Sequence, residues 1–366
     1  MNLPQTNDFS TLLLNDTPLI DVRAPIEFKK GSFPAAFNLP LMDDKEREEV
    51  GTCYKKEGGK AALELGHRLV SGERKKARIR VWSDFIDKHP DAVLYCFRGG
   101  DRSRISQEWL HEAGIDIPRI KGGYKAFRRF ILDELETIDT KCTPVVLGGT
   151  TGSGKTILLK KIEQSVDLEG LAKHRGSAFG RQIEPQPAQI DFEHRLARAL
   201  LKQTQKGAKQ IVMEDESRRI GRLEIPRTLF SYLHEAPLVI LDVPMHKRVR
   251  TIFDEYVSGF QEQFMVRFGK EEGMRSWEEA MLRSFNAISR KLGGERYAKM
   301  LSWFDDALKM QRETGSSKGH DLWIEALLRE YYDPMYEYQI EQNRERIVFR
   351  GDEGEVLDYL TQRTAP

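Results

Sequence analysis

The sequence predicts two α/β domains in series, the second built on a parallel sheet and followed by a mainly helical part. Short, β-branched apolar runs alternate with amphipathic helical stretches along most of the chain, which is typical of strands covered by helices. A glycine-rich turn joins a strand to a helix in each half, and strand patterns stop beyond about Lys247. The 366 residues are enough for two domains of roughly 150 residues each. We place the domains at residues 1–138 and 139–366, the second with a core over about 144–250 and a helical extension over about 251–366.

The first domain is predicted from two strands and two helices. Pro18–Val22 is short, apolar and followed by charge, so it is expected to be a buried strand, and Ala92–Cys96 is expected to be another. Between them, residues 42–80 are heavily charged and end in the basic run Arg74–Arg80, which is either a solvated helix face or a contact for a phosphate backbone. Apolar residues at helical spacing predict one helix through Ile105, Trp109 and Ala113 and another through Tyr124, Phe127, Ile131 and Leu135.

Residues 137–143 are expected to link the domains, and a new strand opens the second one. Pro144–Leu147, Gln210–Met213 and Leu238–Leu241 are predicted strands, separated by helical patterns such as Phe192–Lys202. Strands that alternate with helices form parallel sheets covered on both faces. Beyond the third strand a helical period continues, carried by Trp277, Met281, Phe285, Ile288 and Leu292. The chain to about residue 342 is therefore expected to be mainly helical.

Composition excludes several classes of protein. Hydrophobic residues make up 39% and charged residues 31%, which supports packed cores and excludes a disordered chain. The 58 basic and 57 acidic side chains leave a net charge of +1, so a wholly basic nucleic-acid coat is excluded while a local basic face is not. Three cysteines without CxxC spacing argue against a disulfide scaffold and a cysteine-rich zinc site. No run approaches the roughly 18 apolar residues of a membrane span, and the start MNLPQTNDF lacks the features of a secretion signal. We expect a cytoplasmic protein without a membrane segment and without a metal site of its own.

The segment Gly149–Thr156 reads GTTGSGKT and matches the phosphate-binding pattern G-x-x-x-x-G-K-[ST] of P-loop proteins. A predicted strand precedes it and a helical pattern follows, as the motif requires. Glycines let the backbone curl so that its N–H groups point at phosphate oxygens. Lys155 is expected to neutralise the outer phosphate and Thr156 to ligate Mg²⁺, without specifying ATP as the ligand. The expected phosphate-binding residues are Gly149, Thr150, Thr151, Gly152, Ser153, Gly154, Lys155 and Thr156.

An acidic residue is expected at the end of a strand beside this loop, where it would hold the water shell of the metal. Asp242 follows one apolar run, and Glu214 and Asp215 follow another. The sequence does not choose between these two strand ends, one of which would then be an ordinary solvated end. Arg218 and Arg219 follow the second candidate and are expected near a bound anion or RNA.

Cys96 closes a predicted strand, and the loop after it, CFRGGDRS, opens a helix. Backbone N–H groups in such a loop, the helix N-terminus and two arginines would stabilise an anionic sulfur, which favours the reactive thiolate. The alternative is a buried structural cysteine, the usual fate at a strand end. Cys53 and Cys142 lack such surroundings and are expected to be ordinary thiols. The candidate catalytic residues of this loop are Cys96, Arg98, Gly99, Gly100, Arg102 and Ser103.

The cysteine loop resembles the active-site loop of rhodanese domains, in which the cysteine carries a transferable sulfur as a persulfide. Leu19–Arg23 and Gly31–Asn38 are also similar to the start of a rhodanese domain. One feature differs: five residues lie between Cys96 and Arg102, one more than is usual in single-domain rhodaneses. The longer spacing resembles that of Cys-dependent phosphatases and suits a tetrahedral, phosphate-sized anion better than a bare sulfur atom.

A rhodanese-like domain followed by a P-loop domain is an uncommon pairing. Together with the segments His174–Gly180 and Glu214–Gly221, it resembles the bacterial tRNA 2-selenouridine synthase family, over residues from about 19 to at least 245. The resemblance implies a tRNA-modifying transferase that replaces the sulfur of a wobble 2-thiouridine with selenium from selenophosphate. It also implies geranyl diphosphate as a second substrate, from which a geranylated 2-thiouridine intermediate is made.

These expectations combine into a two-step hypothesis. First, the loop Gly149–Thr156 binds geranyl diphosphate, and Lys155 stabilises the pyrophosphate that leaves as the tRNA sulfur is alkylated. Second, selenophosphate lies in the loop around Cys96, the selenium-carrying nucleophile, which passes selenium to the base carbon as geranyl thiol departs. The expected partners are tRNA and a protein that supplies selenophosphate. Mg²⁺ is compatible with the phosphate loop, and no tightly bound cofactor is expected.

Basic and aromatic side chains supply candidate contacts for RNA. Arg175, in the stretch His174–Gly180, is expected either in a mobile anion-binding loop or in an ordinary turn. Aromatics near the C-terminus are expected to stack on a flipped base, to line a prenyl pocket, or to be ordinary core and surface residues. These aromatics are Trp323, Tyr331, Tyr332, Tyr336 and Tyr338, and the further basic candidates are Arg128, Arg129, Lys247, Arg248 and Arg250.

Two other functions stay open at this point. A Cys-dependent phosphatase would use Cys96 as nucleophile, Arg102 as phosphate clamp and Asp101 as acid, but it leaves the second domain unexplained. An ATP-gated sulfur-relay module would hydrolyse ATP at Gly149–Thr156 while Cys96 passes sulfur on. Turnover of a generic phosphomonoester would favour the first, and ATPase activity without changed tRNA nucleosides would favour the second. The sequence does not specify the oligomeric state or which tRNAs are used.

Overall fold

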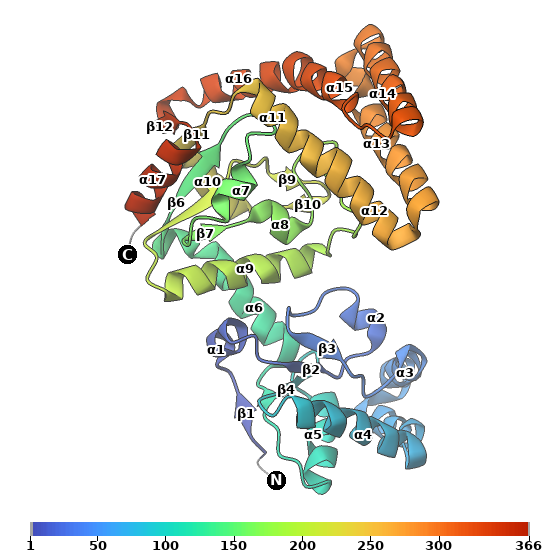
Figure 1. Cartoon of the computed structure of the whole chain (residues 1–366). Helices are drawn as coiled ribbons and strands as arrows, with labels where there is room; N and C mark the ends of the chain where they lie inside the picture. Colours follow the sequence, from blue (N-terminus) through green and yellow to red (C-terminus); the bar gives the residue numbers. More distant parts are fainter. Residues whose placement is uncertain (1–2, 365–366) are drawn as a thin grey trace. The chain divides into compact units, whose positions relative to one another are not determined.

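The computed structural model describes residues 3–364 and separates them into two compact units (Figure 1). The first unit comprises the chain up to Thr137 together with Ala188–Lys202, and the second comprises Ile138–Pro187 together with the chain from Gln203 on. Each unit has its own parallel sheet with helices packed against it. The predicted succession of two α/β domains is therefore confirmed.

The first unit is built on a parallel sheet with strand order β1-β5-β4-β2-β3. Its strands are β1 (Gln5–Thr6), β2 (Leu19–Asp21), β3 (Ala36–Asn38), β4 (Val93–Tyr95) and β5 (Arg119–Ile120). Its helices are α1 (Phe9–Leu14), α2 (Pro25–Phe28), α3 (Asp44–Leu69), α4 (Gly72–Lys88), α5 (Asp101–Glu112) and α6 (Gly123–Glu136). The strands predicted at Pro18–Val22 and Ala92–Cys96 are thus present as β2 and β4, and the charged stretch 42–80 lies mostly in α3 and α4.

A buried ion pair between Asp21, the last residue of β2, and Arg23 is hydrogen-bonded to Tyr95 of the neighbouring strand β4. Asp21 and Arg23 are 0% and 2% exposed. Arg23 donates from Nε to Oδ1 of Asp21 at 3.0 Å and from Nη2 to Oδ2 at 2.6 Å, and the Tyr95 hydroxyl donates to the same carboxylate at 2.7 Å. Nη2 of Arg23 also donates to the Gly31 carbonyl at 2.9 Å. A buried charge is tolerated when it is paired and hydrogen-bonded, as both are here.

Replacing Asp21 with asparagine is expected to destabilise the first unit by about 3–5 kcal/mol, because Arg23 would keep its charge in the interior without a carboxylate. Tyr95→Phe removes a single hydrogen bond to that carboxylate and is the matched control, with an expected loss of about 1–2 kcal/mol. Native-state hydrogen exchange of the amide groups in β2 and β4 measures both losses in the full chain. Equal protection in Asp21→Asn and the wild type would contradict this role of the pair.

Helix α9 (Gln189–Gln205) follows the phosphate loop in the sequence, yet its residues as far as Lys202 belong to the first unit. Nδ1 of His194 lies 2.6 Å from the carbonyl oxygen of Ser32, and the His194 ring stacks on Phe33 with 4.8 Å between ring centroids. Burial and the nearby Arg128 lower the pKa of His194 to about 3, so the ring is neutral. The sequence placed this helix in the second domain, because a helical period does not say which sheet the helix packs against.

The second unit is built on a parallel sheet with strand order β12-β11-β6-β8-β7. Its strands are β6 (Thr143–Gly148), β7 (Ser165–Val166), β8 (Gln210–Glu214), β11 (Leu238–Leu241) and β12 (Ile347–Gly351), with an antiparallel pair of β9 (Arg219–Ile220) and β10 (Leu223–Glu224). The helices around it are α7 (Lys155–Leu159), α8 (Leu168–Ala172), α10 (Arg227–Glu235), α11 (Met245–Ile252) and α17 (Glu353–Thr364), with the short 3-10 turns η1 (Ile138–Thr140) and η4 (Arg344–Arg346). The strands predicted from Pro144, Gln210 and Leu238 are present as β6, β8 and β11.

The expectation that residues 251–366 form only a helical extension is wrong at β12. Ile347–Gly351 pairs in parallel with β11 and lies at the edge of the sheet, where its residues alternate between half-buried and exposed. An edge strand needs only one buried face, so Arg350 interrupts the apolar run that identifies central strands. The last strand of the sheet therefore comes from the far end of the chain.

Between β11 and β12 the chain is helical, as predicted. The helices are α12 (Phe260–Phe268), α13 (Lys270–Leu292), α14 (Gly294–Thr314), α15 (His320–Leu327) and α16 (Asp333–Gln342), and two π-helical segments, η2 (Phe253–Gly259) and η3 (Leu328–Tyr332), interrupt the series. The predicted stripe through Trp277, Phe285 and Leu292 is buried among them, in a core that also contains Trp323. No helix among residues 3–364 is long and apolar enough to cross a membrane.

Candidate active site

The Cys96 loop joins β4 to α5 in the first unit. Cys96 follows the last residue of β4, and Gly100 precedes the first turn of α5. The cysteine is 3% exposed, so it is more deeply buried than a fully open catalytic thiol. Its sulfur donates to Oγ of Ser103 at 3.1 Å, and Ser103 in turn donates to the carbonyl of Gly100 at 3.0 Å. The structure thus holds the thiol against the first turn of α5, and Ser103 is its nearest polar partner.

Two glycine pairs explain how this loop keeps its shape. Gly99 has φ +67°, and a side chain on Gly123 would lie 2.3 Å from the carbonyl oxygen of Cys96. The first amides of α6 close the loop, because Tyr124 N–H donates to the Cys96 carbonyl at 2.8 Å. The doublet Gly122–Gly123 is a supporting element that sequence reasoning missed. Two adjacent glycines at the start of a helical pattern were the available signal.

The two arginines of the loop do not converge on the sulfur. Arg102 forms an ion pair with Glu27, with 2.5 Å between Nη1 and Oε2. Burial raises the pKa of Glu27, but the hydrogen bonds and charge of Arg102 outweigh burial and hold that pKa below its usual value. Arg98 lies over the ring of Phe97, 5.8 Å from the centroid. An anion in this loop would therefore compete with the Glu27 carboxylate for Arg102.

The other cysteines have different surroundings. Burial raises the pKa of Cys142 to about 11, so its thiol stays protonated at neutral pH. Its sulfur lies 3.9 Å from the carbonyl oxygen of Ile138, while Cys53 is partly exposed on α3. Neither lies at the start of a helix after a strand, as Cys96 does.

The phosphate loop Gly149–Thr156 joins β6 to α7 in the second unit, as predicted. Gly152 and Gly154 both have φ +79°, and a side chain on Gly149 would lie 2.7 Å from the Leu241 carbonyl oxygen. Nζ of Lys155 donates to the Gly149 carbonyl at 2.8 Å. The glycines are thus required by the tight curl of the loop, and Lys155 lies along its inner edge.

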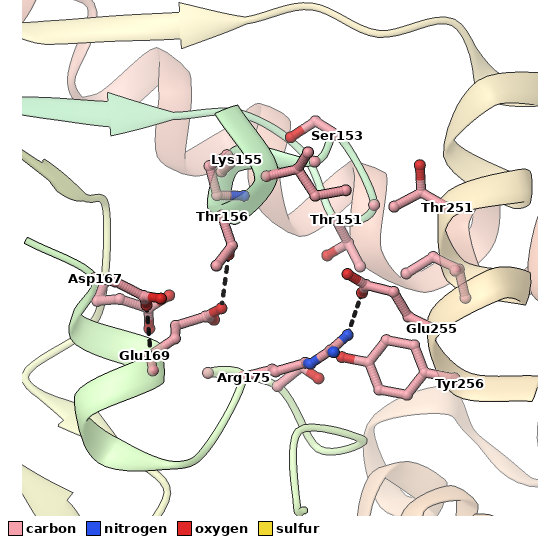
Figure 2. A pocket seen from close by; sticks show the side chains of 18 of the residues that line it. Thr151, Ser153, Lys155, Thr156, Asp167, Glu169, Arg175, Thr251, Glu255 and Tyr256 are labelled. Atoms are coloured by element: carbon pink, nitrogen blue, oxygen red, sulfur yellow. Dashed lines mark hydrogen bonds and ion pairs between the residues drawn. The ribbon is translucent and has the colours of Figure 1, made fainter. Parts of the chain in front are cut away.

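The phosphate loop forms part of the wall of a cavity of about 940 Å³, part of which is open to solvent. Figure 2 shows the side chains that line this cavity. Thr151, Ser153, Lys155 and Thr156 line it from the loop. The Ser153 hydroxyl is buried and has no hydrogen-bond partner among the described residues, and Thr156 donates to Oε2 of Glu169 at 3.2 Å. Loop hydroxyls and a lysine in one cavity can bind a diphosphate group.

An acidic pair from α8 and from the residues after β8 lies across this cavity. The carboxyl groups of Glu169 and Glu216 are hydrogen-bonded to each other, and both residues line the cavity. Burial, followed by the charge of Glu169, holds the pKa of Glu216 well above its usual value, and burial also raises the pKa of Glu169. The two carboxyl groups therefore share a proton, and they release it at a higher pH than ordinary carboxyl groups do. Sequence reasoning missed Glu169, which no strand end marks.

The structure distinguishes the two predicted acidic strand ends. Asp242 forms an ion pair with Arg350, with 2.5 Å between the closest atoms, and does not line the cavity. Glu214 is 1% exposed and accepts a hydrogen bond from Leu168 N–H at 2.8 Å, and burial raises its pKa well above the usual value. Asp215 carries an interaction with Lys155 that opposes the effect of burial on its pKa. The end of β8 therefore lies beside the phosphate loop, with Glu216 lining the cavity and Asp215 close enough to Lys155 to interact with its charge, while Asp242 is paired with Arg350 outside the cavity.

The stretch His174–Gly180 forms one wall of the cavity. Arg175 pairs with Glu255 and lies over the ring of Tyr256, 5.2 Å from the centroid (Figure 2). A side chain on Gly176 would lie 2.6 Å from the Glu216 carboxyl oxygen, so the loop packs directly on the acidic pair. Arg175 thus lines the cavity, where it would lie near an anion bound by the phosphate loop.

Other basic candidates lie elsewhere. Arg218 and Arg219 both pair with Glu224 on the β9–β10 hairpin and do not line the cavity, so the expectation that they lie beside its anion is wrong. Arg248 is 5% exposed, pairs with Asp333 and donates to the Thr151 carbonyl at 2.9 Å. It therefore supports the phosphate loop from behind and is not available to RNA.

The remaining RNA candidates have mixed surroundings. Arg74 and Arg78 of the basic run pair with Glu46, and most of that run is exposed on α4. Among the aromatics, Trp323 and Tyr332 are buried, while Tyr338 is 67% exposed. Two further tyrosines, Tyr331 and Tyr336, pack against the helical core, and Tyr336 also lines the phosphate cavity.

Comparisons with known proteins give one family match for each half of the chain. The rhodanese-like domain family matches residues 6–130, and the AAA domain of tRNA 2-selenouridine synthase matches residues 142–366. A tRNA 2-selenouridine synthase of a Sulfurovum species is 53% identical over 360 residues, covering 98% of this chain and 99% of that protein. Proteins of the same description from Marinobacter nauticus and Pseudomonas fluorescens are 49% and 50% identical, covering 99% and 98% of this chain and the same shares of those proteins.

Proposed function

Because the chain belongs to the tRNA 2-selenouridine synthase family, we propose that it replaces the sulfur at C2 of a thiolated tRNA uridine with selenium. The observation that carries this proposal is the similarity along nearly the whole chain, which includes both the Cys96 loop and the phosphate cavity. A chalcogen carrier alone would not need a phosphate loop, and a phosphate-loop enzyme alone would not need the thiol.

The phosphate cavity is proposed to bind geranyl diphosphate for the first step. The tRNA sulfur attacks C1 of the geranyl chain, the C1–O bond breaks, and its electron pair leaves with the diphosphate. Lys155 and the loop amides oppose the negative charge that grows on that leaving group. Alkylation matters because sulfide is a poor leaving group from the base, whereas geranyl thiol is a better one.

The carboxyl pair of this cavity fits a magnesium ion that accompanies the diphosphate. Glu169, Glu216 and the Thr156 hydroxyl are hard oxygen ligands of the kind that Mg²⁺ prefers. No group of three or more His, Cys, Asp or Glu side chains among residues 3–364 forms a metal site, so the diphosphate and water would complete the coordination. When bound, the ion would neutralise part of the charge of the diphosphate.

The affinity for magnesium pyrophosphate is expected to rise with pH, because the cation requires Glu169 and Glu216 to release their shared proton. The raised pKa values place this release above the usual carboxyl range, and one proton gives at most about a tenfold change in affinity per pH unit. The affinity should level off above the pKa of the pair. Calorimetric titration of the full chain at several pH values measures this slope.

Glu216→Gln is expected to remove the pH dependence of pyrophosphate binding, while Asp242→Asn, at the neighbouring strand end, should keep it. Asp242 is the suitable control because it pairs with Arg350 outside the cavity. A slope that survives Glu216→Gln would show that another group releases the proton.

The Cys96 loop is proposed to bind selenophosphate for the second step. The selenium of selenophosphate attacks C2 of the alkylated base, the C2–S bond breaks, and geranyl thiol leaves. The Cys96 thiolate then attacks the phosphorus, the Se–P bond breaks with its electron pair on selenium to give 2-selenouridine, and water hydrolyses the phosphocysteine to phosphate. The position of the thiol at the start of α5, next to Ser103, supports this role. Displacement of Glu27 from Arg102 by the selenophosphate anion would add a positive charge to the loop.

Reconstitution tests the whole proposal. The full-length protein is incubated with 2-thiouridine-containing tRNA and either geranyl diphosphate, selenophosphate or both, and the tRNA nucleosides are identified by mass spectrometry. Geranyl diphosphate alone should give the geranylated nucleoside, and 2-selenouridine should need both substrates. Formation of 2-selenouridine without geranyl diphosphate would refute the two-step order, and absence of both products would refute the function.

A further inference from the structure

A second, apolar pocket of about 330 Å³, part of it open to solvent, lies in the second unit beside the phosphate cavity. It is lined by residues of α11, α15, η2, η3 and the loop after α8, among them Phe179, Ile252, Trp323, Ile324, Leu328 and Tyr332. We call it the Trp323 pocket.

The Trp323 pocket shares a boundary with the phosphate cavity. Thr151, Ser177, Ile252 and Tyr256 line both. Thr151 belongs to the phosphate loop itself, so the apolar pocket lies next to a ligand whose phosphates occupy that loop. The two cavities together describe an amphiphilic ligand, charged at one end and apolar at the other.

Two polar side chains at this boundary, Ser177 and Tyr256, already have partners. The hydroxyl of Ser177 interacts with the phenols of both Tyr256 and Tyr332. Burial raises the pKa of both phenols, so they stay neutral. Beyond them the pocket is lined by hydrocarbon and aromatic side chains. A purine base or a ribose would leave its own polar groups unpaired there, which is unfavourable, whereas a hydrocarbon chain would not.

Both π-helical segments of the second unit contribute to this pocket, η2 through Tyr256 and η3 through Leu328 and Tyr332. A π-helical turn adds a residue to the helix, distorts its packing against neighbours and is frequent at functional sites. The distortions occur here on two helices that face one cavity, which is an observation independent of the cavity itself.

We propose that the Trp323 pocket binds the prenyl chain of the alkyl donor and that Ile324 and Leu328 set the length of the chain accepted. The inference rests on the proposed function, in which a prenyl diphosphate alkylates the tRNA sulfur. The pocket makes and breaks no bond. It positions the chain so that C1, next to the diphosphate, lies at the boundary of the two cavities.

Changing the pocket's size is expected to change which prenyl diphosphate the enzyme prefers. In Leu328→Phe the larger ring shortens the pocket, so the ratio of kcat/KM for the C10 over the C5 donor should fall at least about tenfold, the scale on which hydrophobic pockets discriminate. Leu328→Ala enlarges the pocket and should raise the ratio for the C15 over the C10 donor. The assay uses the full chain, thiolated tRNA and dimethylallyl, geranyl and farnesyl diphosphates.

Leu322→Ala is the matched control, because Leu322 lies on α15 but is 54% exposed and does not line the pocket. Binding of inorganic pyrophosphate shows that each variant keeps a folded phosphate loop. If Leu328→Phe no longer binds pyrophosphate, the test depends on Leu328→Ala alone. Its preference for donor length is expected to change in the opposite direction, toward longer chains. Unchanged chain-length ratios in a folded variant overturn the pocket assignment and leave the proposed function intact. A wild-type protein that transfers no prenyl chain at all overturns the proposed function, and this inference with it.

Discussion

Cys96→Ser is expected to abolish 2-selenouridine formation and to leave geranylated 2-thiouridine as the product that accumulates. Serine preserves the size of the side chain and its contact with Ser103, but it supplies no thiolate to take the phosphoryl group from selenium. Loss of a nucleophile of this kind lowers turnover by a factor on the order of 10³ or more. The geranyl step uses the phosphate loop of the other unit and should keep its rate. Mass spectrometry of tRNA nucleosides, with purified protein and both donors, measures the two products together.

The other two cysteines supply the controls for this variant. Cys53 is partly exposed on α3, and Cys142 is buried with a raised pKa. Cys53→Ala and Cys142→Ala should both keep selenium insertion. Selenium insertion by Cys96→Ser, or loss of both geranylation and selenation in this variant, would contradict the assignment of the two steps to separate loops.

Lys155→Ala is expected to lower geranyl transfer by about 10²–10³-fold, because the departing diphosphate loses the ammonium group closest to its charge. In the free protein this ammonium donates to the Gly149 carbonyl, within the loop that the diphosphate would occupy. Selenouridine should disappear as well when only 2-thiouridine is offered, since the second step then has no alkylated base. The readout is the rate of geranylated nucleoside formation.

Supplying tRNA that is already geranylated distinguishes loss of the geranyl step from general damage to the protein. tRNA that already carries geranylated 2-thiouridine should be converted to 2-selenouridine by Lys155→Ala at the wild-type rate. Lys161→Ala is the charge-matched control, because Lys161 pairs with Glu353 outside the phosphate cavity. Failure of this conversion would mean that Lys155 also acts in the selenium step.

The fold was predicted mainly from the spacing of apolar residues along the sequence. β2, β4, β6, β8 and β11 were all found from short apolar runs, because a strand covered on both faces must be apolar throughout. β12 was missed since an edge strand has only one face to bury, and its sequence includes Arg350. The sequence placed α9 in the second domain, whereas its residues as far as Lys202 belong to the first unit, because a helical period does not record where an apolar helix face will pack.

The two sites were predicted from short, contiguous motifs. The phosphate loop and the Cys96 loop each follow a strand and precede a helix, so both could be located from contiguous residues. Glu169, Gly123 and Glu27 could not, because each reaches its site from a different element. The choice of the β8 end over Asp242 depended on a partner, Arg350, that lies 108 residues further along the chain.

The sequence by itself determined the two reactive loops, since a glycine-rich turn between a strand and a helix is a local feature of the backbone. Only the tertiary structure decided what faces those loops: the proton-sharing pair of Glu169 and Glu216, the carboxylate on Arg102 and the apolar pocket beside Thr151. The physical reason is that a pKa, an ion pair and a cavity arise from groups brought together by packing, and no spacing along the chain records which groups will meet.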